Sequence, residues 1–235
     1  AADRAADDLA ANLWARREHF VPELVPVDQS VEEALNASQH PVVLVDVADN
    51  VGGGAPGDGT VLLQALLDAG AKGACIVIWD PAAAAACHDL GTGARFQGKV
   101  GGKADDRHGQ PAEIDGMIAF AAPVTYQRGS SYMTGQRVDL GRVGVVDANG
   151  VLVVLTERRA MPFDADHLRV VGIDPARQRI LVCKSAIGWR AAFGDIAAHH
   201  MLVTTPGVCS ADLTSLPFRK GQALYPLNPD ATWPP

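Results

Sequence analysis

Apolar and polar positions along the chain change their spacing from one segment to the next. Over the first 20 residues the apolar positions lie near helical spacing and Pro22 follows, which predicts an amphipathic opening helix. A second short helix is expected between Pro26 and His40, with Ser30 as its N-cap residue. Residues 1–40 are therefore predicted to be a helical lead-in or inter-domain connector, followed by an α/β domain over residues 41–235.

Two apolar runs of strand length follow, PVVLVDVAD from Pro41 and ACIVIWD from Ala74. Runs without polar alternation are typical of strands covered on both faces. The glycine-rich segment DNVGGGAPGDG and an apolar-faced helix, TVLLQALLDAG ending at Gly70, lie between them. This is a βαβ unit, which predicts a parallel pair of strands with a right-handed crossover. A helix from Pro81 to His88 comes next.

The pattern then becomes rich in short valine-containing segments and glycines. Between Arg95 and Thr156, the turn Asp147–Gly150 separates VGVV from VLVVL, which predicts an antiparallel hairpin. A turn or helix is expected at Phe163–Val171. Later expected elements are a strand at Ile180–Lys184, a helix around Arg190–Ala198, a strand at Met201–Thr204 and an irregular tail over Leu224–Pro235. The predicted fold is α/β, with a βαβ-containing parallel or mixed sheet and a β-rich antiparallel middle section.

Charge and composition exclude several classes of function. The net charge of −7 and the scattered Lys and Arg residues make nucleic acid an unexpected partner. No apolar run approaches the roughly 20 residues of a membrane span. Four widely spaced cysteines and an acidic start without a signal-like stretch predict free thiols, most of them buried, in a cytoplasmic protein. The chain does not begin with Met, which is typical of a processing boundary or a missing upstream segment.

The glycine-rich segment invites comparison with nucleotide sites. Gly52–Gly57 satisfies G-x-G-x-x-G, and Asp80 ends the next strand, where a ribose-binding acid would lie. Four residues separate the strand from the first glycine, however, and Asp49 and Asp58 bring negative charge to the place of a pyrophosphate. A P-loop also fails, because Asp58-Gly59 replaces Lys-Ser/Thr. A dinucleotide-binding enzyme therefore stays a weaker alternative.

A plain structural interpretation of this loop is a flexible crossover in which Asp58 caps the helix starting near Thr60. It leaves the position unexplained, since loops at the carboxyl ends of parallel strands are where open α/β sheets bind ligands. The segment VGGKADDRHG is either a solvated turn or a source of oxyanion binding and proton transfer by Lys103 and His108. Lys184 and Ser185 follow an apolar strand, where Lys184 either binds an oxyanion or extends its head to water.

Metal and thiol sites have no clear pattern in the chain. His199 and His200 are adjacent, so on a strand they face opposite sides and do not easily share one ion. H-E-x-x-H does not occur, and no metal ligand is assigned. Cys87-His88 adjacency does not place an imidazole over the sulfur, so a cysteine nucleophile is not expected.

The chain carries VADNVGGGAPGDGTVLLQALLDAG, VGGKADDRHGQP, TERRAMPFD with LRVVGIDP, ILVCKSAIGWRAAF and TPGVCSADLTSLPFR in this order. Together these segments, which span about Val42–Tyr225, resemble the C-terminal domain of the MlrC-like zinc metallopeptidases. The resemblance implies a partner domain at the N-terminal side that holds the zinc ligands and the hydrolytic water. The site would then lie between the two halves, and this chain alone is expected to be inactive.

The resemblance also suggests roles for residues. Asp49, Asn50 and the backbone N–H groups of Gly52–Gly54, including Gly53, would orient the substrate or groups around the metal. The expected activity is zinc-dependent hydrolysis of peptide or other amide bonds in a small substrate. In contrast to the His usual in the family after the Lys-Ser pair, Gly188 stands here. The alternative function is a non-catalytic binding module, or a subunit pairing with a separate zinc-bearing chain; a homo-oligomer is also possible.

Overall fold

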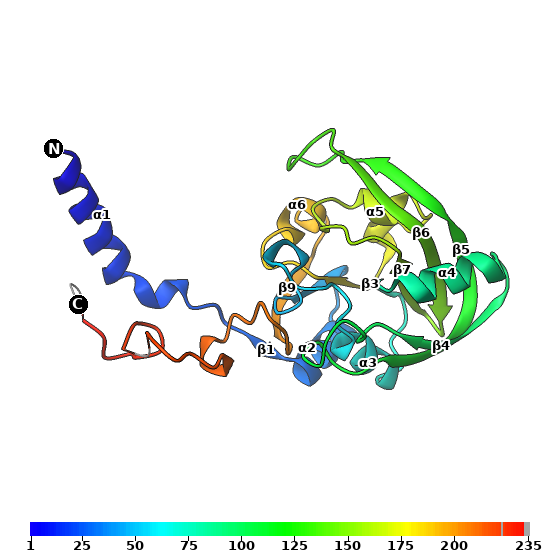
Figure 1. Ribbon diagram of the computed structural model, residues 1–235, viewed down its shortest axis with the longest axis horizontal. Helices are drawn as coiled ribbons and strands as arrows, with labels where there is room; N and C mark the ends of the chain where they lie inside the picture. The colour runs from blue at the N-terminus through cyan, green and yellow to red at the C-terminus, as the bar shows by residue number, and fades with distance from the viewer. Residues whose placement is uncertain (222, 233–235) are drawn as a thin grey trace. The chain divides into compact units, whose positions relative to one another are not determined.

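One mixed sheet of nine strands organises the computed structural model, which describes residues 1–221 and 223–232 (Figure 1). The strands are β1 (Val25–Pro26), β2 (Val42–Asp46), β3 (Ala74–Trp79), β4 (Arg95–Val100), β5 (Ala112–Gln127), β6 (Arg137–Ala148), β7 (Val151–Thr156), β8 (Ile180–Cys183) and β9 (His199–Thr204). Their order is β1-β9-β2-β8-β3-β7-β6-β5-β4. Neighbouring strands in the first part of this order, β1-β9-β2-β8-β3-β7, are parallel. Neighbouring strands in the second part, β7-β6-β5-β4, are antiparallel. The predicted mixed α/β fold is confirmed.

The predicted βαβ unit is present, but its two strands are not neighbours. β2 leads through α3 (Val61–Asp68) into β3, and both strands run in the same direction. β8 lies between them and pairs with each, Val42 opposite Ile180 on one side and Ala74 opposite Ile180 on the other. All five residues of β2 are buried, as expected for a strand with neighbours on both edges and helices on both faces.

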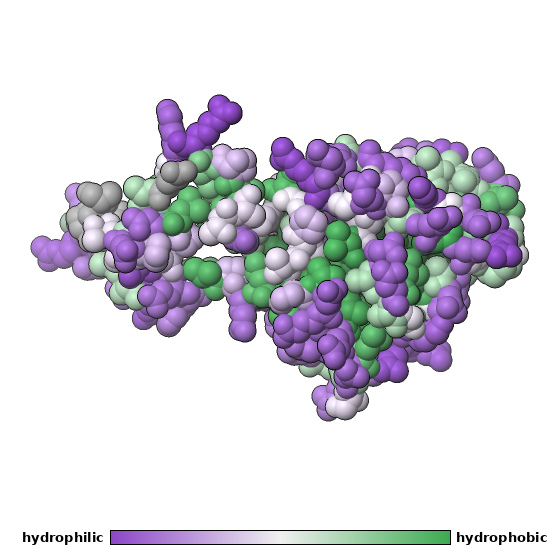
Figure 2. Space-filling model, turned by 90° about the horizontal axis from the view of Figure 1, so that it is seen from below, coloured by the Kyte–Doolittle hydropathy of each residue, from purple (hydrophilic) through white to green (hydrophobic). Residues whose placement is uncertain are grey.

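Helices cover both faces of the sheet. α2 (Val27–Asn36), α3 and α4 (Pro81–Leu90) share one hydrophobic cluster with alternate residues of β2 and β3. The shorter helices α5 (Asp166–Arg169) and α6 (Trp189–Phe193) lie on the opposite side in Figure 1, where α6 contacts β2. Successive side chains of a strand point to opposite faces, so the sheet separates two layers of side chains. On the side of the molecule shown in Figure 2, hydrophobic residues reach the surface between hydrophilic ones.

Two hairpins shape the antiparallel half. The predicted turn between β6 and β7 is confirmed, with Asn149 and Gly150 at φ 56° and 95°, as a type I′ turn requires. The longer hairpin of β5 and β6 carries bulges at Ile118/Phe120 and Val124/Thr125. Bulges bend a strand and increase its twist. Figure 1 shows the tip of this hairpin projecting beyond the sheet on the side of α6.

Packing divides the chain into two compact units, one made of residues 24–210 and the other of residues 1–23 with 211–235. The first unit holds the whole sheet. The smaller unit contains α1 (Ala2–Ala15), η1 (Arg17–Phe20) and η4 (Leu213–Ser215), and the rings of Trp14 and Tyr225 pack edge to face at 6.0 Å. The division predicted at residue 40 differs from this one, since α2 belongs with the sheet. Residues 224–232 of the predicted irregular tail carry no helix or strand, and 233–235 lie outside the described residues.

Two local predictions were wrong. Ser30 does not cap α2, because the helix begins at Val27 and the buried Ser30 hydroxyl donates to the Val27 carbonyl at 2.7 Å. The late helix is shorter than Arg190–Ala198, since α6 ends at Phe193 and residues 194–196 form a turn. Within the described residues, no helix is long and apolar enough to cross a membrane.

Candidate functional site

A buried ion cluster ties together the carboxyl ends of neighbouring parallel strands. Lys184 follows β8, and its Nζ donates to Asp46 Oδ2 at 2.7 Å and to the Gly59 carbonyl at 2.8 Å, with Asp49 Oδ2 at 2.9 Å. These three acceptors match the three N–H bonds of an ammonium group. Burial lowers the pKa of Lys184, but Asp46 and Asp49 outweigh burial and raise that pKa above its usual value, so the side chain stays charged.

Asp49 closes the glycine-rich loop on itself. Its Oδ1 accepts from the Gly57 N–H at 2.7 Å, and its Oδ2 accepts from the Gly59 N–H at 2.7 Å. A Cβ atom on Gly59 would lie 2.8 Å from Asp49 Oδ2, so only glycine permits this approach. The amides that a pyrophosphate would need are therefore already used. This arrangement argues against the dinucleotide interpretation.

Asp58 and Asp80 do not have the roles considered for them. Asp58 Oδ2 accepts from the N–H groups of Lys103 and Ala104 at 2.8 Å each, and α3 has no side-chain cap, so the alternative in which Asp58 caps this helix is wrong. Asp80 caps α4 through the Ala83 N–H at 3.0 Å and also binds Lys103 Nζ at 2.7 Å. Both carboxylates therefore hold the loop that follows β4.

His108 is buried at the same edge of the sheet. Its Nδ1 lies 2.7 Å from Asp105 Oδ1, and its Nε2 accepts from the Val208 N–H at 3.3 Å. With Nε2 accepting, the hydrogen resides on Nδ1 and is donated to Asp105. Nε2 is also 3.8 Å from Asp49 Oδ1. The structure thus brings Asp49, Lys184 and His108 together, as supports of the loop.

The exposed tip of the loop carries the remaining predicted residues. Gly52, Gly53 and Gly54 are exposed, but their N–H groups donate within the loop, to Asn50 Oδ1, the Asn50 carbonyl and the Val51 carbonyl. They are not available as donors to a substrate in this structure. Asn50 and Ser185, in contrast, line an open groove beside the loop.

This groove has a volume of about 690 Å³, large enough for a small peptide or amide. Its lining comes from the loop after β2, the tip of the β5–β6 hairpin, the segment before α5 and the start of α6. The lining residues that matter for its chemistry are Asn50, Tyr132, Phe163, Ser185, Ile187 and Arg190. Four of them, Tyr132, Phe163, Ile187 and Arg190, were not predicted, because nothing in the sequence around each one marks it as part of a groove.

A buried ion pair fixes the hairpin tip against the segment before α5. Arg128 Nη1 lies 2.5 Å from Asp164 Oδ2, with both side chains buried, and Arg128 Nη2 donates to the Met161 carbonyl at 2.9 Å. The Ser130 hydroxyl donates to the Phe163 carbonyl at 3.0 Å. A charge pair that is geometrically satisfied in this way resists separation. The aromatic wall of the groove is thereby held in place.

Gly188 determines how closely the floor of the groove packs. A Cβ atom at this position would lie 2.6 Å from Phe163 Cδ1 and 2.7 Å from Ser185 Oγ. Any larger residue would force Phe163 or Ser185 to move.

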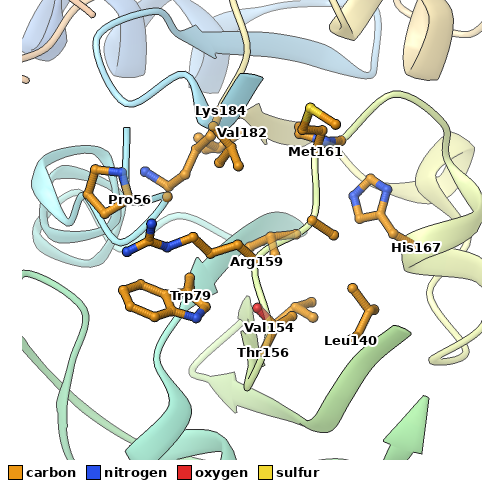
Figure 3. A pocket seen from close by; sticks show the side chains of 15 residues that line it. Pro56, Trp79, Leu140, Val154, Thr156, Arg159, Met161, His167, Val182 and Lys184 are labelled. Carbon is orange, nitrogen blue, oxygen red and sulfur yellow. The ribbon is translucent and has the colours of Figure 1, made fainter. Parts of the chain in front are cut away.

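A second, smaller cavity lies behind the loop at the carboxyl ends of β3, β7 and β8 (Figure 3). Its volume of about 30 Å³ is room for roughly one water molecule. Figure 3 shows Arg159 extending between Trp79 and Lys184, and its guanidinium lies 3.9 Å from the centre of a Trp79 ring. This cavity is too small for a substrate and most of its lining is apolar.

Comparison with known proteins gives consistent matches. The family model described as MlrC C-terminus matches residues 44–220. Microcystinase C from Sphingomonas sp is 38% identical over 167 residues, which cover 71% of this chain and 32% of that protein. A crystal structure from Mesorhizobium sp. BNC1, described as a "putative metallopeptidase", superposes with a TM-score of 0.80 and 28% identity, covering 94% of this chain and 44% of that one. The chain thus spans about a third of the first protein and less than half of the second, and the resemblance found in the sequence is confirmed.

Proposed function

Because the chain belongs to the MlrC C-terminal family, we propose that it is the C-terminal part of a zinc-dependent hydrolase acting on peptide or other amide bonds. In this proposal the chain shapes the substrate site, and an N-terminal half supplies the metal ligands. The names of the two relatives, a microcystinase and a "putative metallopeptidase", support hydrolysis with a metal. Their greater lengths leave room for the second half.

The residues of this chain do not fit a zinc site of their own. Zinc in proteins takes three or four His, Cys, Asp or Glu ligands. In residues 1–221 and 223–232, no three such side chains lie close enough to share an ion. The carboxylates nearest the loop, Asp46 and Asp49, are engaged by Lys184, by Thr205 and by backbone amides. The ligands are therefore assigned to the other half, and the metal would there activate water and polarise the amide carbonyl.

Within this chain, we assign two kinds of role to the predicted residues. Asn50 and Ser185 line the groove and would contact the substrate. Asp49 and Lys184 act as positioning residues that hold the loop closed, and His108 supports them from the neighbouring loop. Asp58 and Lys103 hold the next loop in the same way.

The observation that carries the proposal is the position of the groove. It lies beside the loop that follows β2, at the carboxyl edge of the parallel strands, where open α/β sheets bind ligands. The exposed side chains of Ile187 and Tyr132, 70% and 53% accessible, border it. Exposed apolar residues at a groove rim suit burial against another domain.

The test compares this chain with the longest natural form of the protein on a panel of peptides and amides. The longer form is expected to hydrolyse at least one substrate, to lose activity with a chelator and to regain it with zinc. Residues 1–235 alone are expected to be inactive and to bind no stoichiometric zinc in elemental analysis. Chelator-insensitive hydrolysis, or one zinc ion per chain in residues 1–235, contradicts the proposal.

A subunit that pairs with a separate zinc-bearing chain is the second candidate, favoured by the same exposed rim of the groove. Mixing this chain with a separately produced zinc-bearing half distinguishes the two arrangements. Activity that appears only on mixing two natural gene products supports the separate subunit.

A further inference from the structure

The groove carries positive charge in a chain that is negative overall. Arg190 lines it, no Asp or Glu does, and the whole chain has a net charge of −7. Five other arginines pair with carboxylates, namely Arg95, Arg128, Arg142, Arg158 and Arg169. Within the described part of the chain Arg190 has no such pair, and its guanidinium lies 5.3 Å from the centre of a Trp189 ring. It is therefore free to bind an anionic group.

Two further side chains of the groove have hydrogen-bond donors that are not used within the part of the protein that the structure describes. The Ser185 Oγ accepts from the Gly188 N–H at 3.0 Å, and its hydroxyl hydrogen meets no acceptor among the residues that the structure describes. Asn50 Oδ1 accepts from the Gly52 N–H at 3.1 Å, which leaves the Asn50 amide hydrogens without a described acceptor. A groove with a guanidinium, a hydroxyl and an amide donor, and without carboxylates, is complementary to an oxyanion.

The remaining surface of the groove is apolar. The rings of Tyr132 and Phe163 pack edge to face, 4.8 Å apart, and Ile187 is exposed beside them. Such a wall offers contact area to a hydrophobic side chain. A single arginine provides one positive charge, and its planar fork matches one carboxylate. The combination suits a small molecule with one carboxylate and one apolar side chain.

We propose that this groove binds the carboxylate of an N-acylated amino acid or short peptide through Arg190, with the adjacent apolar side chain against Tyr132 and Phe163. The inference rests on the proposed function, because it specifies the substrate class of the same site. In this inference, Arg190 is the residue that makes the groove prefer amides carrying a carboxylate over amides without a charge.

Binding to residues 1–235 can be measured directly, without hydrolysis, by NMR titration. The probe is N-acetyl-L-phenylalanine, and its neutral analogue N-acetyl-L-phenylalaninamide is the comparison. The acid is expected to bind about tenfold more tightly than the amide, as one charge-assisted bidentate contact provides, and to shift the signals of Asn50, Ser185 and Ile187. Arg190→Gln is expected to lower the affinity for the acid to that for the amide.

Arg177→Gln is the matched control, because Arg177 is exposed in η3 (Pro175–Arg177) and does not line the groove. Its affinity for the acid should equal that of the unmodified chain. Equal binding of acid and amide, an equal loss in both arginine variants, or tighter binding of inorganic phosphate than of the acid would overturn the inference. If selective binding holds while the longest natural form hydrolyses nothing, the proposed function fails and the binding site stands.

Discussion

The Nζ atom of Lys184 lies 2.9 Å from Oδ2 of Asp49, and this contact joins the end of β8 to the loop that follows β2. Both side chains are buried, at 5% and 1% exposure. The same ammonium group binds Asp46, so one lysine is shared by two carboxylates inside the protein. The shape of the loop and the stability of the sheet therefore depend on the same charge.

Replacing this lysine should strongly destabilise the protein. Lys184→Met leaves Asp46 and Asp49 buried without a cation, and breaking a buried ion pair costs about 3–5 kcal/mol. Urea denaturation of the variant measures the loss in the free energy of unfolding. Lys99→Met, at an exposed position of β4, is the control and should change it by less than about 0.5 kcal/mol. Similar stabilities for the two variants would show that the cluster is not a structural requirement.

Because of His167, the free energy of unfolding should decrease on mild acidification. Burial lowers the pKa of this imidazole in the folded protein, although Asp164 partly opposes it, so the folded state resists a proton that the unfolded state accepts. The stabilising contribution is complete above the unfolded pKa of about 6.5 and is lost as the pH falls from there towards the folded pKa, with a slope of at most about 1.4 kcal/mol per pH unit.

The measurement is the free energy of unfolding at pH 7.5 and pH 5.5 for the unmodified chain and for His167→Gln. The variant should lose less stability between these two values than the unmodified chain does. His199→Gln, at an exposed position of β9, serves as the control and should keep the dependence of the unmodified chain. An unchanged pH dependence in His167→Gln would mean that another group accounts for it.

Gly188→Ala should distort the groove. The added methyl group would meet Phe163 and Ser185 at 2.6 and 2.7 Å, and such overpacking costs about 1–3 kcal/mol. Thermal denaturation measures the loss, and the NMR titration described above measures the weaker binding. Gly98→Ala is the control, because its nearest contact would be an ordinary 3.4 Å to Phe96. A Gly188→Ala variant as stable as Gly98→Ala would show that Phe163 moves without cost.

The cysteines should differ sharply in reactivity. Burial raises the pKa of Cys75 to about 12 and, together with Asp80, that of Cys87 to about 11, and it also raises that of Cys183, which is buried too. Only Cys209 is partly exposed. A thiol reagent such as DTNB at pH 8 should therefore modify one thiol per folded chain and four after unfolding. Rapid modification that persists in Cys209→Ser would contradict this assignment.

Several elements could be predicted from the sequence because their signals are local. The valine runs that became β2 and β7 and the Asn149-Gly150 turn need no distant partner to be recognised. The insertion of β8 between β2 and β3 could not be predicted, because strand order depends on pairing between residues more than 100 positions apart, such as Val42 and Ile180. Asp58 was misjudged for a related reason, since its partners are the amides of Lys103 and Ala104 in another loop.

In the candidate site, too, residues with a local sequence signal could be predicted and residues placed only by the fold could not. Ser185 was singled out because it follows a recognisable strand and Asn50 because of the family resemblance, and both line the groove. Arg190 gave no such signal, although it stands five residues after Ser185, because nothing local distinguishes a groove arginine from a solvated one. Only the folded chain brings it beside Tyr132 from the hairpin tip.

The place of β8 in the sheet also affects how the protein can be synthesised. In the sheet of the described residues β2 pairs with β8 on one edge and with β9 on the other, so its five buried residues have neither neighbour until residues 180–204 have been made. During translation, both edges of the hydrophobic segment that forms β2 therefore stay unpaired while well over 100 further residues are added. Open edges of this kind attract strands of other chains. Nascent chains stalled before residue 180 should consequently be the species most prone to aggregation, and most in need of a chaperone.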